Sequence, residues 1–335
     1  MQAPALPATM RAAVQAGTDG VRMQTVPVPR PGPADILVRV RASALNRADL
    51  GLAQGRQHGP HGGPGTVLGL EWAGEVVSAG PQVTGVAPGD RVMCSGIGAF
   101  AEYAVTDYRR SFPLPDPSMD LARAACLPIA LRTMHDALVT QGGLRPGQSV
   151  LIQGASSGVG LMGLQVARHL GAGLVLGTST TPERRARLGG FGAHHALDTT
   201  DPGWVDAVLS HTDGRGVDLV IDQLSGPYAS LNLRATAVGG CVVNVGRMAG
   251  QNAVFDFETH SMRRIRYQGV TFRTRSVDEV AAIAERVRAD LWPALAAGRL
   301  ALPIDVRLPL EAVPQALARM QANEHFGKIV IEQPG

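Results

Sequence analysis

Apolar and polar residues alternate along much of the first third of the chain. Residues 36–42 show the alternation expected of a strand with one buried face. Further short apolar runs predict strands at 74–80, 90–94 and 100–105. Glycine and proline cluster between these runs and predict tight turns. Short strands at close spacing predict a small barrel-like β domain from residue 10 to about residue 128, and the glycine-rich loop at 54–65 is expected to be mobile or ligand-facing.

From about residue 121 the pattern changes to apolar runs that alternate with helical spacing. The runs predict strands at 150–152, 174–178, 217–222, 240–246 and 267–272. The segments between and around them predict helices at 122–138, 159–170, 181–188, 228–237 and 277–297. This alternation predicts a doubly wound parallel sheet. The chain then returns to strand-like and helical patterns at 301–308, 311–323 and 328–332.

A glycine-rich turn at 154–163 separates one of these strands from its helix. Such a turn is typical of a dinucleotide site, because it presents backbone N–H groups at a helix N-terminus to a pyrophosphate. The same residues also fit the G-x-S-x-G elbow of α/β-hydrolases, with Ser156 as nucleophile. A third interpretation is a turn of small residues that only lets the helix pack on the sheet.

The neighbouring strands favour the nucleotide interpretation. In open α/β sheets, ligands bind beyond the carboxyl ends of the strands, and three predicted strands end at Gly154, Asp222 and Gly246. Asp222 could instead cap the turn that follows it. A hydrolase would need a downstream acid and histidine, and Asp222 with His260 is the pair that could be nominated. Nothing distinctive flanks that pair, and a hydrolase leaves the β domain unexplained.

The end of the second strand bears on the choice of nucleotide. An NAD site usually has an acid there, but this chain has hydroxyl residues up to Thr181 and then Arg184 and Arg185. Guanidinium and hydroxyl groups suit a 2′-phosphate, so NADPH is the predicted cofactor. The alternative is that Thr181 caps a helix and the arginines are solvated, and both interpretations can hold together.

Composition and charge exclude several classes of protein. The chain has 335 residues, a net charge of +3 and three scattered cysteines, which form no metal-type spacing. Its basic residues are dispersed without interleaved aromatics, which argues against nucleic-acid binding as a main function. No apolar stretch is long enough to span a bilayer, and residues 1–11 show no secretory signal. A cytoplasmic enzyme with two domains is therefore expected, with no membrane partner.

Several ordered motifs make the chain resemble the medium-chain dehydrogenase/reductase superfamily, and within it the zinc-lacking quinone oxidoreductase branch that includes zeta-crystallin. The motifs lie at 44–50, 68–71, 89–92, 100–103, 127–128 with Thr133, 154–160 and 326–331. The resemblance implies a Rossmann doubly wound parallel sheet inserted in a GroES-like β-barrel substrate domain. The implied GroES-like domain is 1–126 with 299–335, and the implied Rossmann domain is 127–298.

The resemblance also bears on metal binding. Metal-dependent members of the superfamily have a cysteine where this chain has Asn46 and a histidine where it has Leu70, so Glu71 alone remains. The loop histidines His58 and His61 are better explained as solvated side chains than as ligands. No catalytic metal is therefore predicted, because a tetrahedral zinc needs several nitrogen or sulfur ligands.

By the same resemblance, Asn46 lies near the nicotinamide and the acceptor carbonyl, although it could instead be an asparagine that stabilises a turn. Asp49 helps shape that pocket and Thr133 reaches the nicotinamide ribose or carboxamide. The pyrophosphate is held by Ser156, Ser157, Gly158, Val159 and Gly160. The 2′-phosphate is held by Ser179 and Arg184. The nicotinamide half is lined by Asp222, Gly246, Phe272 and Arg273, and Lys328, the only lysine of the chain, matches a lysine near the cofactor.

The predicted function is an NADPH-dependent, zinc-independent reductase that transfers hydride to a quinone or a similar conjugated carbonyl acceptor. An enoyl or enone reductase is the alternative, and a serine hydrolase using Ser156 or a crystallin-like binding protein is a weaker one. Three departures from the family pattern concern the site: Gln57 and Thr199 replace tyrosines, and Arg247 replaces a small or apolar residue. The resemblance further implies a homodimer through the edge strand near 267–272.

Overall fold

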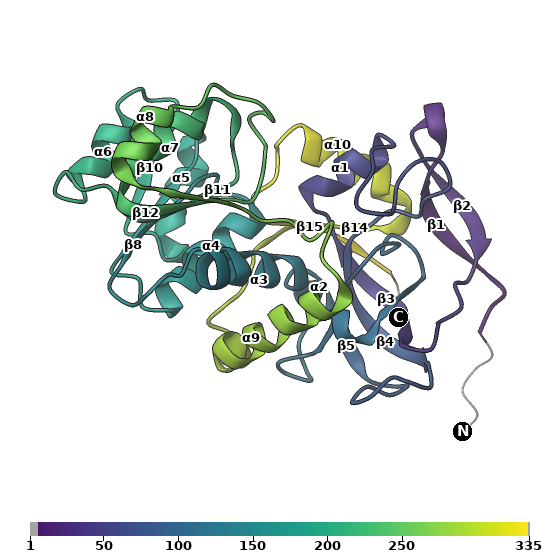
Figure 1. The fold of residues 1–335 in the computed structure, drawn as a ribbon. Helices are drawn as coiled ribbons and strands as arrows, with labels where there is room; N and C mark the ends of the chain where they lie inside the picture. The colour runs from purple at the N-terminus through teal and green to yellow at the C-terminus, as the bar shows by residue number, and fades with distance from the viewer. Residues whose placement is uncertain (1–5, 334–335) are drawn as a thin grey trace. The chain divides into compact units, whose positions relative to one another are not determined.

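The computed structural model describes residues 6–333 of the chain, which forms two compact units (Figure 1). The first unit is Met1–Ile129, Arg273–Arg288 and Leu302–Gly335, and the second is Ala130–Phe272 and Ala289–Ala301. Residues 1–5 and 334–335, which the predicted domain ranges included, lie outside the described residues.

A curved sheet built on one long central strand dominates the first unit. Strand β3 (Asp35–Ala44) pairs along one edge with β4, and along the other with β6 near its start and β15 near its end. The remaining strands of this unit are β1 (Thr9–Gln15), β2 (Val21–Pro27), β4 (Glu71–Ala79), β5 (Arg91–Ser95), β6 (Tyr103–Asp107), β7 (Ser111–Pro113), β14 (Ile304–Pro309) and β15 (Lys328–Glu332). Strands from both ends of the chain therefore share one sheet, in the order β14-β15-β3-β4-β5-β7.

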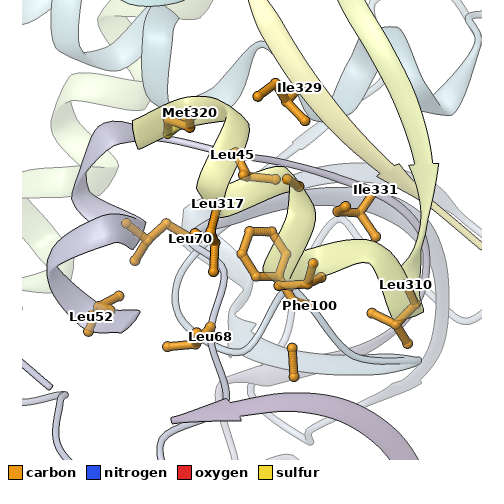
Figure 2. Close-up of a cluster of buried hydrophobic side chains, with 13 residues drawn as sticks. Leu45, Leu52, Leu68, Leu70, Phe100, Leu310, Leu317, Met320, Ile329 and Ile331 are labelled. Carbon is orange, nitrogen blue, oxygen red and sulfur yellow. The ribbon is translucent and has the colours of Figure 1, made fainter. Parts of the chain in front are cut away.

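Two helices from opposite ends of the sequence pack over an apolar cluster in this unit. They are α1 (Arg47–Ala53) and α10 (Val313–Gln321). Figure 2 shows Leu317 and Met320 of α10 beside Leu45 and Leu70, with Phe100 at the centre of the cluster. The other helical segments of this unit are α2 (Leu121–Ala125) and the single turns Gly17–Asp19, Tyr108–Arg110 and Leu310–Ala312.

The second unit is a six-stranded parallel sheet with helices on both faces. Its strand order is β10-β9-β8-β11-β12-β13. The strands are β8 (Ser149–Ile152), β9 (Leu174–Thr178), β10 (His195–Leu197), β11 (Val217–Asp222), β12 (Thr236–Asn244) and β13 (Arg266–Gly269). Val150, Leu151 and Ile152 are fully buried, as expected of a strand covered on both faces. The predicted doubly wound parallel sheet is confirmed.

The helices of this unit follow the strands that they connect. α4 lies on one face of the sheet, and α6, α7 and α8 lie on the other (Figure 1). Their bounds are α3 (Pro128–His135), α4 (Gly158–His169), α5 (Pro182–Arg185), α6 (Trp204–Ser210), α7 (Ala229–Ala235) and α8 (Phe257–Arg263). α3 continues as a π-helix (Asp136–Gln141), and Leu188–Phe191 and Gly226–Tyr228 are single turns. The last long helix, α9 (Val277–Ala296), is divided between the units, since its residues up to Arg288 belong to the first unit and the rest to the second.

Several element predictions need correction. The helix expected at 122–138 is broken by Pro128 into α2 and α3, because proline cannot donate a backbone hydrogen bond inside a helix. The strand expected at 267–272 ends at Gly269, and the helix expected at 228–237 ends at Ala235, where β12 begins. The short elements α1, β10, α6 and α8 were not predicted, since seven residues or fewer carry little periodicity.

The segment Arg273–Arg288 belongs to the first compact unit, whereas the implied Rossmann range of 127–298 included it. Two contacts hold it there. Arg109 pairs with Asp278, and the Arg288 guanidinium lies 5.6 Å from the centre of the Phe112 ring.

Candidate active site

The turn after β8 is closed by its own serine. The Ser157 hydroxyl caps α4 by accepting a hydrogen bond from the Gly160 N–H, at 3.0 Å. It also lies 3.0 Å from the Gly154 carbonyl and 3.1 Å from Gln223 Oε1. A Cβ on Gly160 would lie 2.6 Å from the Gly154 carbonyl oxygen, so only glycine fits where the helix begins. The start of α4 thus packs closely against the turn, and its N–H groups are of the kind that bind anions at helix N-termini.

A ladder of buried polar side chains, joined to one another by hydrogen bonds, holds this turn in place. The Gly154 N–H donates to Thr178 Oγ1 at 2.9 Å, and the Thr178 hydroxyl donates to Gln153 Oε1 at 2.8 Å. Gln153 Nε2 donates to Asn232 Oδ1 at 2.8 Å, and Gln223 Nε2 donates to the Gln153 carbonyl at 2.9 Å. Sequence reasoning missed these residues, although a polar residue at the end of an apolar run was a usable signal. The ladder preorganises the turn before any ligand binds.

The end of β9 lies against the same turn. The Ser179 hydroxyl donates to Ser156 Oγ at 3.1 Å, so a residue predicted at the 2′-phosphate meets one predicted at the pyrophosphate. Arg185 donates to the Ser179 carbonyl and to the Asp198 carboxylate, each at 2.8 Å. Asp198 was not among the predicted residues. Hydrogen bonds from Thr200 and the Arg185 guanidinium keep its pKa below the usual value.

Arg184 lies half-buried on the single turn of α5, which begins with Pro182. The Thr181 side chain makes no capping hydrogen bond to this helix. Thr181 is nevertheless the N-cap residue of α5, and its backbone carbonyl accepts a hydrogen bond from the Arg185 N–H at 2.9 Å. Arg184 at the 2′-phosphate stays a prediction.

Asp222, at the end of β11, shapes a loop. Its Oδ1 atom accepts hydrogen bonds from the N–H groups of Leu224 and Ser225, each at 2.8 Å. Burial raises the pKa of this carboxyl above its usual value. The Ser225 hydroxyl then donates to the Gly246 carbonyl at 2.7 Å, and a Cβ on Gly246 would lie 2.5 Å from the Gln223 carbonyl oxygen. Asp222 thus has the capping role considered in the sequence analysis, and glycine is needed at 246 for close backbone approach.

The three remaining residues predicted near the nicotinamide lie on different segments of the chain. Thr133 lies half-buried on α3, and Phe272 lies half-buried just beyond β13, both in the second unit. Arg273 is exposed and belongs to the first unit. Their roles at the cofactor stay predictions.

A buried cluster of ionisable groups forms in the first unit around Asn46. Lys328 Nζ lies 2.6 Å from Glu71 Oε1 and 3.0 Å from Asn46 Oδ1. Asn46 Nδ2 donates to the same Glu71 oxygen at 2.9 Å. Lys328 and Glu71 are the first residues of β15 and β4, and Asn46 lies just beyond the end of β3, which is the strand between them. Lys328, predicted at the cofactor, thus lies with the residue predicted at the acceptor.

Asp49 completes this cluster. Its Oδ2 atom accepts a hydrogen bond from the Asn46 backbone N–H at 2.7 Å, which caps the start of α1. Burial, which outweighs the favourable hydrogen bonds and the Lys328 charge, raises the pKa of Asp49 to about 7. The cluster therefore holds two carboxyl groups and one ammonium, and it balances its charge when Asp49 keeps a proton.

Two family models match the chain in the regions of these two sites. The model described as alcohol dehydrogenase GroES-like domain matches residues 32–116, and the model described as zinc-binding dehydrogenase matches residues 158–287. The chain belongs to the medium-chain dehydrogenase/reductase superfamily. Its structure has the fold of that superfamily, and the predicted resemblance is confirmed.

Solved structures similar to this dehydrogenase/reductase include quinone oxidoreductases. One from Pseudomonas syringae pv. Tomato DC3000 is 25% identical with a TM-score of 0.85, and a mycobacterial one is 26% identical with a TM-score of 0.84. Each match covers 97% of this chain and 100% of the other. The site is consistent with the zinc-lacking quinone oxidoreductase branch.

Curated relatives of this dehydrogenase/reductase include large synthases. The erythronolide synthase EryA2 of Saccharopolyspora erythraea is 35% identical over 90% of this chain and 8% of its own length. The spectinabilin polyketide synthase protein NorB of Streptomyces orinoci is 32% identical over 90% of this chain and 13% of its own length. The chain therefore spans about a tenth of the length of these relatives.

Dehydrogenases of this superfamily use a nicotinamide cofactor. The residues of the hydrolase alternative have other partners in the structure. Ser156 accepts from Ser179, Asp222 accepts from two backbone amides, and the His260 ring lies 5.4 Å from the Phe255 ring.

Potential metal ligands were also compared with the structure. Among residues 6–333, no group of three or more histidine, cysteine, aspartate or glutamate side chains could hold a metal ion. Leu70 packs in the apolar cluster of Figure 2. His58 and His61 pair through their backbones, and burial together with the Arg273 guanidinium lowers the pKa of His58 to about 4.

Within residues 6–333, no helix is both long and apolar enough to cross a membrane.

Proposed function

We propose that this oxidoreductase is an NADPH-dependent, zinc-independent reductase of a quinone or a similar conjugated carbonyl acceptor. The observation that carries the proposal is the cluster of Asn46, Glu71 and Lys328, which holds an amide donor at Asn46, the position where metal-dependent relatives are expected to have a cysteine. An electrophilic acceptor needs little beyond positioning and a hydrogen bond to its carbonyl oxygen. The reaction converts a quinone, NADPH and a proton into the hydroquinone and NADP⁺.

The residues of the second unit suit this cofactor. The N–H groups at the start of α4 and the hydroxyl of Ser156 would hold the pyrophosphate, next to Gly158 and Gly160, which carry no side chain. Ser179 and Arg184 would hold the 2′-phosphate. NADPH, when bound, supplies a hydride from its nicotinamide ring. Thr133, Asp222, Gly246 and Phe272 would line the nicotinamide half, with Asp222 acting through the loop that it caps. The assignment of Arg273, which lies in the first unit, stays a prediction of the sequence.

Nucleotide titration followed by a turnover assay tests this proposal. Intrinsic fluorescence is titrated with NADPH and with NADH, and the consumption of NADPH is then measured with a naphthoquinone. We expect tighter binding of NADPH than of NADH and turnover with the quinone. Absence of binding to either nucleotide would refute the proposal.

An enoyl or enone reductase is the second candidate. It is favoured by the polyketide synthase relatives, which match about nine tenths of this chain at 32% to 35% identity. Such a reductase must also deliver a proton to the α-carbon of the acceptor. Asp49, the carboxyl group beside Asn46 that has a raised pKa, is fully buried, and Gln57 replaces the loop tyrosine of relatives. Turnover with an enoyl thioester but not with a naphthoquinone would select this candidate.

We further propose that the oxidoreductase forms a homodimer through β13. This strand is the edge of the parallel sheet, and all four of its residues are exposed. Large apolar side chains are exposed nearby in the sequence and on α8, namely Val254, Phe257, Met262 and Tyr267. An unpaired edge flanked by apolar surface is typical of a strand that pairs with another chain.

A further inference from the structure

The side-chain amide of Asn46 is held between two groups of opposite hydrogen-bonding character. An ammonium can only donate, so Lys328 must face the amide oxygen, at 3.0 Å. A carboxylate can only accept, so Glu71 must face the amide nitrogen, at 2.9 Å. The two neighbours therefore fix which end of the amide is oxygen and which is nitrogen.

The partners of this amide are themselves held in place. Lys328 is 3% exposed and Glu71 is fully buried, and their ion pair is 2.6 Å long. The second oxygen of Glu71 accepts a hydrogen bond from the Ile129 N–H, at 2.9 Å, near the start of α3. Rotation of the carboxylate would break this bond and the ion pair together. The orientation of the Asn46 amide thus rests on a rigid buried network.

One hydrogen of the amide remains weakly held. The Asn46 Nδ2 group has two N–H bonds, and the one not directed at Glu71 reaches the Ala44 carbonyl at 3.4 Å. This contact is longer than the other hydrogen bonds of the cluster and close to the limit of such an interaction. A carbonyl oxygen of an incoming ligand could replace it at little cost. A flipped amide would instead present an oxygen, which repels that ligand.

We propose that Lys328 is a positioning residue that acts through Asn46 and keeps an amide N–H available to the carbonyl oxygen of the acceptor. This inference rests on the proposed reductase function and deepens it. It assigns Lys328 to the acceptor side of the reaction, whereas the sequence resemblance implied a contact with the cofactor.

Substitution of Lys328 by methionine separates these roles. In Lys328→Met, we expect kcat/KM for a naphthoquinone to fall by about tenfold to a hundredfold, the size expected for losing a hydrogen bond to a charged group. We expect the Kd of NADPH, measured by fluorescence, to stay within about twofold of the wild-type value. A weaker affinity for NADPH with unchanged kinetics toward the quinone would overturn the proposal.

Loss of Lys328 also leaves a buried carboxylate without its partner, which lowers the thermal stability. The double variant Lys328→Met/Glu71→Gln removes both charges and controls for this effect. We expect its Tm to recover toward the wild-type value while kcat/KM for the quinone stays low. Recovery of both quantities would mean that Lys328 only balances the charge of Glu71, and the proposal would be wrong.

A measurement that does not depend on turnover distinguishes failure of this inference from failure of the proposed function. In asparagine-labelled protein, the Asn46 side-chain amide should give a slowly exchanging NMR signal that Lys328→Met shifts and broadens. An unchanged signal would overturn the positioning role even if the wild-type protein reduces quinones. A shifted signal in a protein that reduces no quinone would retain the positioning of Asn46 and refute only the reductase assignment.

Discussion

At the scale of single residues, burial decides the charge state of the acceptor side of the site. Glu71 and Asp49 are fully buried and share one ammonium, that of Lys328. The Lys328 ammonium lies close to Glu71, at 2.6 Å, whereas Asp49 is the carboxyl group whose pKa is raised. A second carboxylate charge would have no matched cation, so the proton on Asp49 is what neutralises the cluster.

Asp49 should therefore make stability depend on pH. Its pKa rises from 3.8 in the unfolded chain to about 7 in the folded protein, so the folded state binds more protons between these values. The free energy of unfolding should fall as pH rises from 4 to 7, by up to about 1.4 kcal/mol per pH unit from this group. Asp49→Asn cannot titrate, so its stability relative to the wild type should increase over this window.

Urea unfolding of the wild type and Asp49→Asn at several pH values measures this difference. Other carboxylates, including Asp107 and Asp198, have lowered pKa values and contribute equally to both proteins. Parallel stability profiles for the two proteins would contradict the buried, protonated state of Asp49.

Arg184 is the residue that should set the preference between the two nucleotides. Arg184 is the cation proposed for the 2′-phosphate, while the neighbouring Arg185 pairs with Asp198, at 2.8 Å. Arg184→Ala should raise the Kd of NADPH by about tenfold to a hundredfold, the effect of losing a hydrogen bond between charged groups, and leave that of NADH nearly unchanged. Arg187→Ala, at an exposed position of the same segment, is the matched control. An equal loss for both nucleotides in Arg184→Ala would refute the assignment.

At the scale of elements, the glycine-rich turn and α4 form one unit of strand, turn and helix. The G-x-S-x-G pattern was ambiguous because the same small residues serve a hydrolase elbow, a phosphate turn or close packing. In the structure, two glycines of this segment are needed for close packing at different places. Gly160 allows the helix to begin against the Gly154 carbonyl, and Gly163 packs against Met134, where a Cβ would lie 2.8 Å from the sulfur.

Alanine at position 160 should test the phosphate turn. In Gly160→Ala the added Cβ would lie 2.6 Å from a backbone oxygen, so the turn must shift. We expect NADPH affinity to fall by about tenfold or more, since the helix N–H groups move away from the pyrophosphate. Gly190→Ala is the control, because a Cβ there meets nothing within 4 Å. Equal affinities in the two variants, measured by fluorescence titration, would argue against pyrophosphate binding at this turn.

Features of the site that neighbouring residues determine could be predicted from the sequence, whereas contacts between residues distant in the sequence could not. The glycine-rich turn and the strand end at Asp222 follow from neighbouring residues, whereas the strand expected to run to Gly246 ends at Asn244. The ladder of Gln153, Thr178 and Gln223 joins strands that are distant in sequence, so no local pattern identifies its partners. Lys328 could be singled out as the only lysine, but its contact with Glu71 depends on β15 pairing beside β3.

At the scale of the whole molecule, the two ends of the chain complete one sheet. β15 comes from the last residues described and pairs with β3, which contributes Ala44 next to the site. The segment Arg273–Arg288 likewise returns to the first unit through Asp278 and Arg288. Truncation near the C-terminus would therefore remove Lys328 and an internal strand together.

The proposed dimer can be tested on its apolar surface. Val254 is 90% exposed, so Val254→Asp should leave the fold of the protomer intact and place charge on the interface. We expect this variant to dissociate into monomers at concentrations where the wild type is dimeric, as measured by analytical ultracentrifugation. Leu6→Asp, at an exposed apolar residue of the first unit, is the control. A wild-type protein that is monomeric would contradict the dimer itself.

The sequence by itself determined the alternation of strands and helices, the glycine-rich turn between β8 and α4 and the superfamily, because hydrophobic periodicity and short motifs are local properties. Only the tertiary structure decided that Asn46, Glu71 and Lys328 form one buried cluster and that Asp49 has a pKa of about 7. The physical reason is that desolvation and Coulomb energy depend on which groups strand pairing brings together. Residues 257 positions apart in the chain meet at 2.6 Å, and no pattern along the chain encodes that distance.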